Sequence, residues 1–434
     1  MTAAPLVAPD RFTETRASHI SAAADIIGLA ADQMPTDEQL AHLAWHVAAV
    51  EPSELRHLDR LESTGRPQQT CLTAHRQVAD NLDEILPLPH PLDYEWRFDP
   101  QTRLMLTRRC VQLAGAHGPI ALLGTPTLAP ALSDHGSDVL LLDANAKLMV
   151  TLASARQLGT IQWATTDLET FSPPRVWQHR AAVVVCDPPW YPEGLAAFLC
   201  AAAQLVRPGG AVLVSVPDVL TRPTIADELD HLRSLARQLR LATKAVEPRA
   251  VRYRTPFFEY RALRAAGVRL IPLDWRAGTL WQLTSTGIAP AIPSGRRRAS
   301  GASQIVAEIT IAGVRLRILR ARPVLPGVLA LHPVVPGDTL PTVSRRHPAR
   351  GSATLWTSGN TVLSCADPDL AGLLLRHLTD GNGNWLGHDP DRIAYDFARR
   401  HHLPVCDVRN TLDKIAAVVA SEHDDQAAYR KAAR

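Results

Sequence analysis

The 434-residue sequence has little that would place it in a membrane or an oxidising compartment. No apolar run approaches the ~20 residues that cross a bilayer. The N-terminal stretch MTAAPLVAPDRFTETR lacks the basic region and apolar core of an export signal. The six cysteines are scattered, without a Cys-x-x-Cys pair, which argues against structural zinc and for reduced thiols. With 46% hydrophobic and 21% charged residues, the chain is predicted to be a soluble, cytoplasmic globular protein that binds no membrane and no metal.

Lysine is also scarce, and acids are nearly absent from one long segment. Between Arg249 and Arg350 there are 17 arginines but only four acids, a balance of +13 in a chain whose net charge is +3. A compositional preference for arginine over lysine would explain the arginines but not the missing acids. Such a basic block is typical of proteins that bind a polyanion, so the 249–350 segment is predicted to bind nucleic acid, DNA or RNA.

The chain divides into four predicted regions. Residues 1–88 are expected to form a helical domain, since residues 14–86 carry helical apolar spacing and Thr36 opens a capping box. Residues 89–290 form the main domain, 291–303 (rich in Ser, Gly and Arg) a basic flexible linker, and 304–434 a domain of two hairpins and helices. The terminal domains are also candidate sites for a protein partner.

The main domain alternates helical and short apolar segments. Strands are expected at PIALLG, DVLLLDA, IQWATTD, AAVVVCD, AVLVSVP and GTLWQLTS, with helices between them. Repeated strand–helix–strand units predict an α/β fold, a doubly wound parallel sheet, here with the helical domain before it and an α+β extension after it.

The first four of these strands each deliver a glycine or a carboxylate to their carboxyl ends, where ligands bind in open α/β sheets. Gly124 follows the first strand and would let a ligand approach the backbone. Asp143 follows the second, about 20 residues on, where an acid can accept hydrogen bonds from a ribose diol. Asp167 follows the third and would either contact an adenine amino group or cap the next turn. Asp187 follows the fourth.

The stretch DPPWY begins with this last carboxylate. Pro188 and Pro189 fix φ twice, so that the Asp187 carboxylate and a backbone carbonyl are held as two acceptors, which suit the two hydrogens of an NH₂ group. Trp190 would supply a flat face for stacking a planar base, and Tyr191 would help to hold it. The loop is therefore predicted to clamp an amine.

At these residues the sequence resembles class I methyltransferases that use S-adenosylmethionine, within them the amino-methylating group with Asp-Pro-Pro-Trp or Asp-Pro-Pro-Tyr after the fourth strand. The resemblance covers roughly residues 90–285 and implies a Rossmann-like methyltransferase fold. It implies that Asp187, Pro188, Pro189 and Trp190 carry the reaction on an amine, most simply that of adenine in a nucleic acid. The residues that it implies for S-adenosylmethionine are Gly124, Thr125, Asp143, Ala144 and Asp167. The loop GTPT departs from the family in having one glycine where many members have two or three.

A second resemblance, in spacing, is to the branched-chain polyamine synthases, which transfer an aminopropyl group from decarboxylated S-adenosylmethionine. Those enzymes carry an acidic triplet after the first glycine, where this chain has Thr125-Pro126-Thr127. A third alternative is a catalytically retired methyltransferase fold that serves as a binding subunit.

Two further stretches are candidates for acceptor binding. In RYRTPFFEYRAL, Arg252 and Arg254 would contact phosphates. Tyr253, Phe257 and Phe258 would wall a base pocket, although a place in the core is the alternative for the two phenylalanines. The segment 391–419 has helix-turn-helix character around Leu403-Pro404, which suits nucleic acid, a partner or simple packing.

Overall fold

The computed structural model describes residues 82–115 (without 94), 118–155, 161–218, 225–267, 271, 273, 276–290, 305–320, 326–344, 347–379 and 389–432. The chain folds into two compact units. Among the described residues, the first unit contains 82–87, 97–254 and 276–290, and the second contains 88–96, 255–273 and 305–432. The predicted capping box at Thr36 and the predicted linker 291–303 lie outside the described residues.

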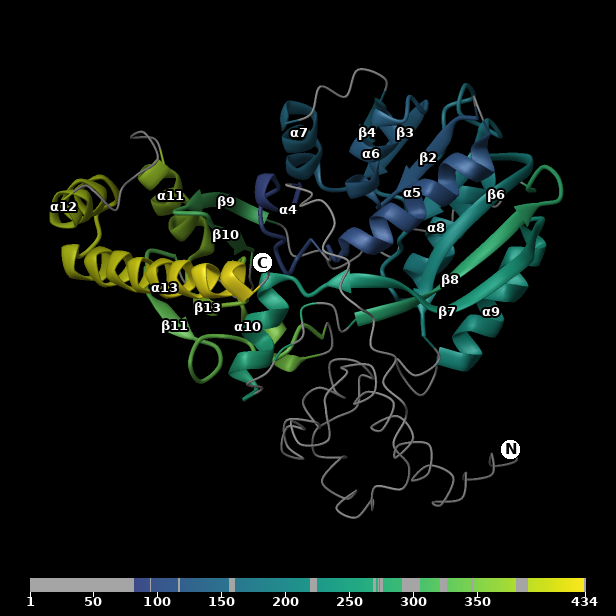
Figure 1. The fold of residues 1–434 in the computed structure, drawn as a ribbon. Helices are drawn as coiled ribbons and strands as arrows, with labels where there is room; N and C mark the ends of the chain where they lie inside the picture. The colour runs from purple at the N-terminus through teal and green to yellow at the C-terminus, as the bar shows by residue number, and fades with distance from the viewer. Residues whose placement is uncertain are drawn as a thin grey trace, which may run out of the picture. The chain divides into compact units, whose positions relative to one another are not determined.

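The first unit is built on an eight-stranded sheet with the order β1-β7-β8-β6-β5-β2-β3-β4 (Figure 1). Strands β2 to β6 run parallel, whereas β8 pairs antiparallel with β6 and β7, and β1 antiparallel with β7. The strands are β1 Arg97–Phe98, β2 Ile120–Leu123, β3 Val139–Asp143, β4 Ile161–Thr165, β5 Ala181–Cys186, β6 Val206–Pro217, β7 Leu241–Arg254 and β8 Arg276–Ser285. The predicted doubly wound, Rossmann-like α/β sheet is confirmed.

Helices connect these strands, and their ends follow from local sequence. In α5 the Asp99 carboxylate accepts a hydrogen bond from the Thr102 amide at 2.7 Å, Pro100 occupies the first turn, and Gly115 ends the helix at φ +69°. The helices of the unit are α4 Leu82–Ile85, α5 Pro100–Ala114, η2 Pro126–Leu128, α6 Ala129–Asp134, α7 Ala146–Ala155, α8 Pro192–Leu205 and α9 Ile225–Gln238.

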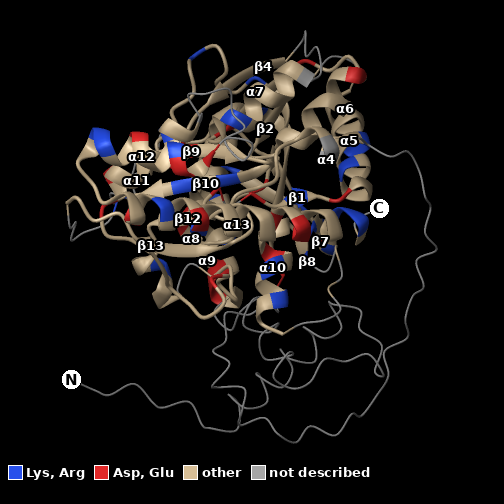
Figure 2. Ribbon diagram, turned by 90° about the vertical axis from the view of Figure 1, so that its left-hand side faces the viewer, with Lys and Arg blue, Asp and Glu red and all other residues tan. Residues whose placement is uncertain are grey.

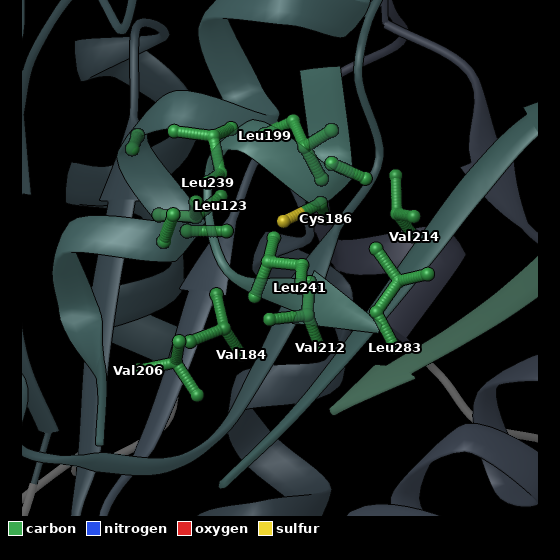
Figure 3. Packing of buried hydrophobic residues seen from close by; sticks show 14 of the residues in the cluster. Leu123, Val184, Cys186, Leu199, Val206, Val212, Val214, Leu239, Leu241 and Leu283 are labelled. Atoms are coloured by element: carbon green, nitrogen blue, oxygen red, sulfur yellow. The ribbon is translucent and has the colours of Figure 1, made fainter. Parts of the chain in front are cut away.

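The core of the unit surrounds β5. Val184 and Cys186 pack in one cluster with Leu199 of α8 and with residues of β6, including Val212 (Figure 3). Successive side chains of a strand point to opposite faces, and Val183, which must point the other way, is also fully buried. The apolar run AAVVVC is therefore a central strand covered on both faces.

Two details of this sheet differ from the sequence expectation. The strand AVLVSVP was predicted to begin at Ala211, but β6 begins at Val206, directly after α8, and so includes Pro208 and both glycines. Its pairing with β5 shifts register in this stretch, where Gly209 has φ +78°, as in a bulge. The whole strand β7 was not predicted, because Leu241–Arg254 contains a proline and its first half is mostly exposed.

The second unit contains a five-stranded antiparallel sheet with the order β11-β13-β12-β10-β9 and a buried apolar cluster against α11, α12 and α13. Both predicted hairpins are present, and the first turns through Ala312 and Gly313 at positive φ, as a type I′ turn requires. Its elements are α10 Phe257–Ala265, β9 Ile305–Ile311, β10 Val314–Leu319, β11 Leu331–Pro333, η3 Pro348–Ser352, β12 Leu355–Thr357, β13 Val362–Cys365, α11 Pro368–Thr379, α12 Pro390–His401 and α13 Val405–Ala432.

A short turn through His402, at φ +54°, joins α12 to α13, as expected of a helix-turn-helix pair. A role for this pair in nucleic-acid binding stays a prediction. No helix in the described part of the chain combines the length and apolar character needed to cross a membrane.

Candidate functional site at the carboxyl ends of β2, β3 and β5

The strand order reverses at β2, since β3 and β4 are added on one side of it and β5 and β6 on the other. Ligands of open α/β sheets bind in the crevice outside such a strand. The residues that follow β2 and β5 are adjacent here. The Asp187 amide donates to the Leu123 carbonyl at 3.1 Å, and the Gly124 amide donates to the Leu142 carbonyl at 3.0 Å.

Gly124 is required at its position for two separate reasons. Its φ of +64° is rarely adopted by residues with a side chain. A Cβ atom would lie 3.0 Å from the Phe198 ring and 3.1 Å from the Asp187 carbonyl oxygen. The turn after β2 therefore packs its backbone directly against the start of the DPPW loop.

Thr125 follows in the same turn and carries a polar group without a partner. The residue is 2% exposed, and its Oγ1 has no hydrogen-bond partner among the described residues. A buried hydroxyl without a partner costs free energy, so it indicates a place where a bound group can complete the hydrogen bonding. This is the one feature of the one-glycine loop that itself points to a ligand.

Asp143 lies at the end of β3, as predicted, and its carboxylate has a fixed orientation. Oδ1 accepts a hydrogen bond from the Asn145 amide at 2.7 Å, and Asn145 in turn accepts one from the Leu148 amide at 3.2 Å at the start of α7. Ala144, between them, is exposed. Asp143 is thus half-buried at the carboxyl end of β3.

Asp167 has the simpler of its two predicted roles in this structure. It is exposed after β4, and its Oδ1 accepts a hydrogen bond from the Glu169 amide at 2.9 Å. The side chain thus stabilises the following turn.

Asp187 is the chemically most distinctive residue of the rim. Its Oδ1 accepts a hydrogen bond from the Tyr253 hydroxyl at 2.5 Å, and the Ser215 hydroxyl lies 2.5 Å from the same Tyr253 oxygen. Burial raises the pKa of Asp187 to about 8, although the hydrogen bonds from Tyr253 and Ser215 act in the opposite direction. Burial and the adjacent carboxylate raise the pKa of Tyr253 well above its usual value, so this hydroxyl stays protonated. Asp187 can therefore exchange a proton near neutral pH.

The rest of the DPPW loop is rigidly seated. The Tyr191 amide donates to the Pro189 carbonyl at 2.7 Å, and α8 begins directly after Tyr191. The Trp190 ring stands edge-on to Tyr253, with 5.5 Å between centroids, and the Arg276 guanidinium lies 5.9 Å from its centre. Trp190 is only partly buried, but these two contacts occupy part of the ring surface that was predicted to stack on a base.

Sequence reasoning missed part of this site. Ser215 was not considered, and Tyr253 was considered only as a possible wall of a base pocket. A signal for Tyr253 existed, since buried Val251 and Tyr253 alternate with half-buried Arg252 and Arg254, the period of a strand with one buried face.

Two of the predicted acceptor-binding residues, Arg252 and Arg254, do not share the face of the sheet on which Tyr253 bonds Asp187. Arg252 and Arg254 flank Tyr253 on β7, and strand alternation directs their side chains to the opposite face of the sheet. Phe257 belongs to the second unit, where it is fully buried with its ring 5.6 Å from that of Tyr429. For Phe257, packing in the core is what the structure shows.

At least five of the 17 arginines of the basic 249–350 segment form ion pairs within the second unit. Arg315 and Arg317 are both bonded to Asp93 and to Glu308, at 2.5 to 2.9 Å. Arg261, Arg264 and Arg320 pair with acids that follow the segment, namely Glu422, Asp425 and Asp369. Blue and red stretches are accordingly interspersed over the described ribbon (Figure 2). The charge asymmetry of the sequence is thus partly an effect of where the ion-pair partners lie along the chain.

Gly278 of β8 lies beside Trp190 and Ser215 and leaves room for both side chains. A Cβ atom there would lie 2.8 Å from Trp190 Cζ2 and 3.0 Å from Ser215 Oγ. We expect Gly278→Ala to destabilise the protein by about 1–3 kcal/mol, the usual cost of overpacking. Gly287→Ala is the matched control, because nothing lies within 4 Å of its Cβ position. Denaturant unfolding measures the stability of both variants. Equal stabilities would show that the space between Gly278 and Trp190 can accommodate a methyl group.

In the part of the chain that the structure describes, no group of three or more His, Cys, Asp or Glu side chains is arranged to hold a metal ion.

No protein-family model matches the chain, and no curated protein matches it. Among solved structures, the branched-chain polyamine synthase of Thermus thermophilus, in complex with N4-aminopropylspermidine and 5′-methylthioadenosine, is 17% identical with a TM-score of 0.48, over 64% of this chain and 95% of that chain. The N-methyltransferase NodS of Bradyrhizobium japonicum is 12% identical with a TM-score of 0.30, over 43% and 98%. An S-adenosylmethionine-dependent methyltransferase of Mesorhizobium loti is 15% identical with a TM-score of 0.29, over 42% and 97%. At these identities the likeness concerns the fold alone.

Proposed function

We propose that this protein is an S-adenosylmethionine-dependent transferase that methylates an amine nitrogen. The observation that carries the proposal is the position of Asp187. Asp187, whose carboxyl has a pKa of about 8, begins a loop with two prolines, and its backbone carbonyl lies directly against the glycine turn that follows β2. An acceptor site and a donor site would thus share one crevice.

The residues around the crevice fit the donor. The backbone at Gly124 admits a close ligand, the Thr125 hydroxyl lacks a partner, and Asp143 presents a carboxylate at the end of β3. These groups would hold the aminoacyl and ribose parts of S-adenosylmethionine, which supplies a methyl carbon whose bond to sulfur breaks as the nitrogen–carbon bond forms. The turn contains no carboxylate, so nothing in it attracts a donor that has lost its own carboxylate.

The chain's own contribution is alignment and proton acceptance. Asp187 and the carbonyl groups of the proline loop would orient the acceptor N–H groups, so that the nitrogen lone pair faces the methyl carbon. As nitrogen acquires positive charge, the Asp187 carboxylate would disperse that charge and take the proton. This reaction needs no covalent bond to the enzyme.

For the acceptor, an exocyclic amine of a nucleic-acid base, adenine first, remains our proposal. It is supported by the aromatic pair Trp190 and Tyr191 at the rim rather than by the basic segment, since several arginines of that segment are paired internally. The Arg276 guanidinium close to Trp190 also disfavours a polycationic acceptor.

A second candidate, transfer of an aminopropyl group to an aliphatic amine, is favoured by one observation. An aliphatic amine is protonated at neutral pH and must lose a proton before it can attack. A carboxyl with a pKa of about 8 is basic enough to assist this loss, whereas an exocyclic base amine needs no such step.

The deciding measurement is titration calorimetry of the purified protein with S-adenosylmethionine and with its decarboxylated form. We expect Gly124→Ala to weaken binding of the intact donor by roughly tenfold or more, equivalent to about 1.4 kcal/mol. Gly136→Ala is the matched control, since Gly136 also has positive φ but nothing within 4 Å of its Cβ position. Equal losses in the two variants would mean that backbone strain, not crowding at the site, is responsible.

The other outcomes separate the candidates. Preference for the decarboxylated donor would favour aminopropyl transfer. Binding of neither form would contradict both enzymatic proposals and favour a binding subunit. Where the intact donor binds, transfer of a labelled methyl group to RNA, DNA, free nucleotides and spermidine identifies the acceptor class.

A further inference from the structure

Tyr253 lies on β7 and Asp187 directly follows β5, two strands that are not neighbours in the sheet. Their contact depends on a missing side chain in the strands between them. Tyr253 lies on β7 and Ser215 on β6, with β8 between them. Two strand spacings amount to about 9.6 Å, yet the two hydroxyl oxygens are 2.5 Å apart. The tyrosine side chain therefore crosses over β8 to reach the end of β5.

The register of the sheet shows how this crossing is possible. Tyr253 pairs with Arg276 and Ser215 pairs with Leu280, so that Gly278 lies between them on the same face of β8. Any side chain at Gly278 would meet Trp190 and the Ser215 hydroxyl at 3.0 Å or less. One missing side chain in β8 thus lets three residues of different strands converge.

We propose that Tyr253 is the positioning residue of the acceptor site: its hydroxyl, held by Ser215, fixes the Asp187 carboxyl in the orientation that receives a proton from the acceptor nitrogen. This inference rests on the proposed function. In the step concerned, the N–H bond of the alkylated nitrogen breaks, its electron pair stays on nitrogen, and the proton moves to the carboxylate oxygen. Tyr253 neither gains nor loses a proton, because its hydroxyl donates to Asp187 throughout.

The geometry favours positioning over packing as the role of the hydroxyl. The Tyr253 ring already packs against Phe98, with centroids 5.0 Å apart, and nearly perpendicular to the ring of Trp190, with centroids 5.5 Å apart. A phenylalanine keeps both ring contacts and loses only the hydrogen bonds of the hydroxyl, to Asp187 and to Ser215. Tyr253→Phe therefore isolates the hydroxyl.

We expect Tyr253→Phe to lower kcat by about 100-fold, the typical cost of a misplaced reacting group, with donor affinity unchanged. Because the lost hydrogen bond normally lowers the pKa of Asp187, the limb of the pH–rate profile that reports its ionisation should move to higher pH. Tyr260→Phe is the control: Tyr260 is a half-buried tyrosine of α10 whose ring packs against Tyr429.

A double-variant cycle shows whether Tyr253 acts through Asp187. Tyr253→Phe combined with Asp187→Asn should be no slower than Asp187→Asn alone, because the hydroxyl then has no carboxylate to orient. Additive losses, or an unmoved pH limb in Tyr253→Phe, would overturn the positioning role.

A readout without turnover separates this inference from the proposed function. The infrared C=O band of the protonated Asp187 carboxyl, assigned by its loss in Asp187→Asn, should persist to higher pH in Tyr253→Phe than in the wild type. A wild type that alkylates no acceptor contradicts the proposed function, whereas an infrared titration that is identical in the two proteins contradicts the inference.

Discussion

Asp187→Asn is expected to lower kcat by roughly 10²- to 10⁴-fold, the range usual for loss of a group that transfers a proton. The amide keeps the size of the carboxyl but cannot take a proton. The Gly124 turn and Asp143 are untouched, so donor affinity measured by calorimetry should not change. The wild-type rate should rise through about pH 8 as Asp187 ionises, and this limb should be absent in the variant.

The same substitution has a signature in stability. The folded-state pKa of Asp187 is raised far above its value of 3.8 in an unfolded chain, so the folded protein holds a proton that the unfolded chain has released. The free energy of unfolding of the wild type should therefore fall, relative to that of Asp187→Asn, as the pH rises from about 4 to about 8. Above pH 8 the difference between the two proteins should stay constant. Thermal unfolding of both proteins across this range measures the difference, and a constant difference would show that Asp187 is not perturbed.

Arg261→Met is the second large effect and concerns the second unit. Arg261 bonds Glu422 at 2.8 Å, Asp425 at 2.9 Å and Thr361 Oγ1 at 2.9 Å, and the Glu422 side chain is completely buried. Removing the guanidinium leaves a buried carboxylate without its cation, which typically costs about 3–5 kcal/mol. Hydrogen exchange of the α13 amides reports this loss locally, without assuming that the two units unfold together.

The pH dependence and two further variants test the cause. Burial already raises the pKa of Glu422 against the effect of Arg261, so in Arg261→Met the pKa rises further and the loss should be larger at pH 8 than at pH 5. Adding Glu422→Gln should restore part of the stability. Arg392→Met, which removes an exposed pair with Asp396, should cost no more than about 1 kcal/mol. A loss in Arg392→Met as large as that in Arg261→Met would rule out burial as the reason.

The sequence was sufficient for those parts of the site whose signals are local. The run AAVVVC and the rigid Asp187-Pro188-Pro189 that follows it indicate a central strand with a carboxyl at its end. Gly115 ends α5, and Ala312-Gly313 forms the turn of the first predicted hairpin. Each of these signals depends on residues a few positions apart.

The parts that depend on distant residues could not be predicted. Tyr253 is 66 residues from Asp187, and no spacing rule connects them across β8. Gly278 appears in the sequence as an ordinary strand glycine, and only the register shows what its missing side chain permits. In the same way, the charge of the 249–350 segment suggests an external polyanion until Asp93 and Glu422 are seen beside its arginines.

The second unit is assembled from three separate stretches of chain, and this limits how the protein can be divided. A fragment of residues 304–434 would contain Glu422 without Arg261, and Arg315 and Arg317 without Asp93. Glu422 would be left buried without its arginine, and Arg315 and Arg317 would share Glu308 as their one remaining partner among these ion pairs. The stretches of the second unit therefore alternate along the sequence with those of the first. A deletion or a fusion joint near residue 300 lies at a boundary between the two compact units, yet it separates the C-terminal part of the second unit from ion-pair partners in its own earlier stretches.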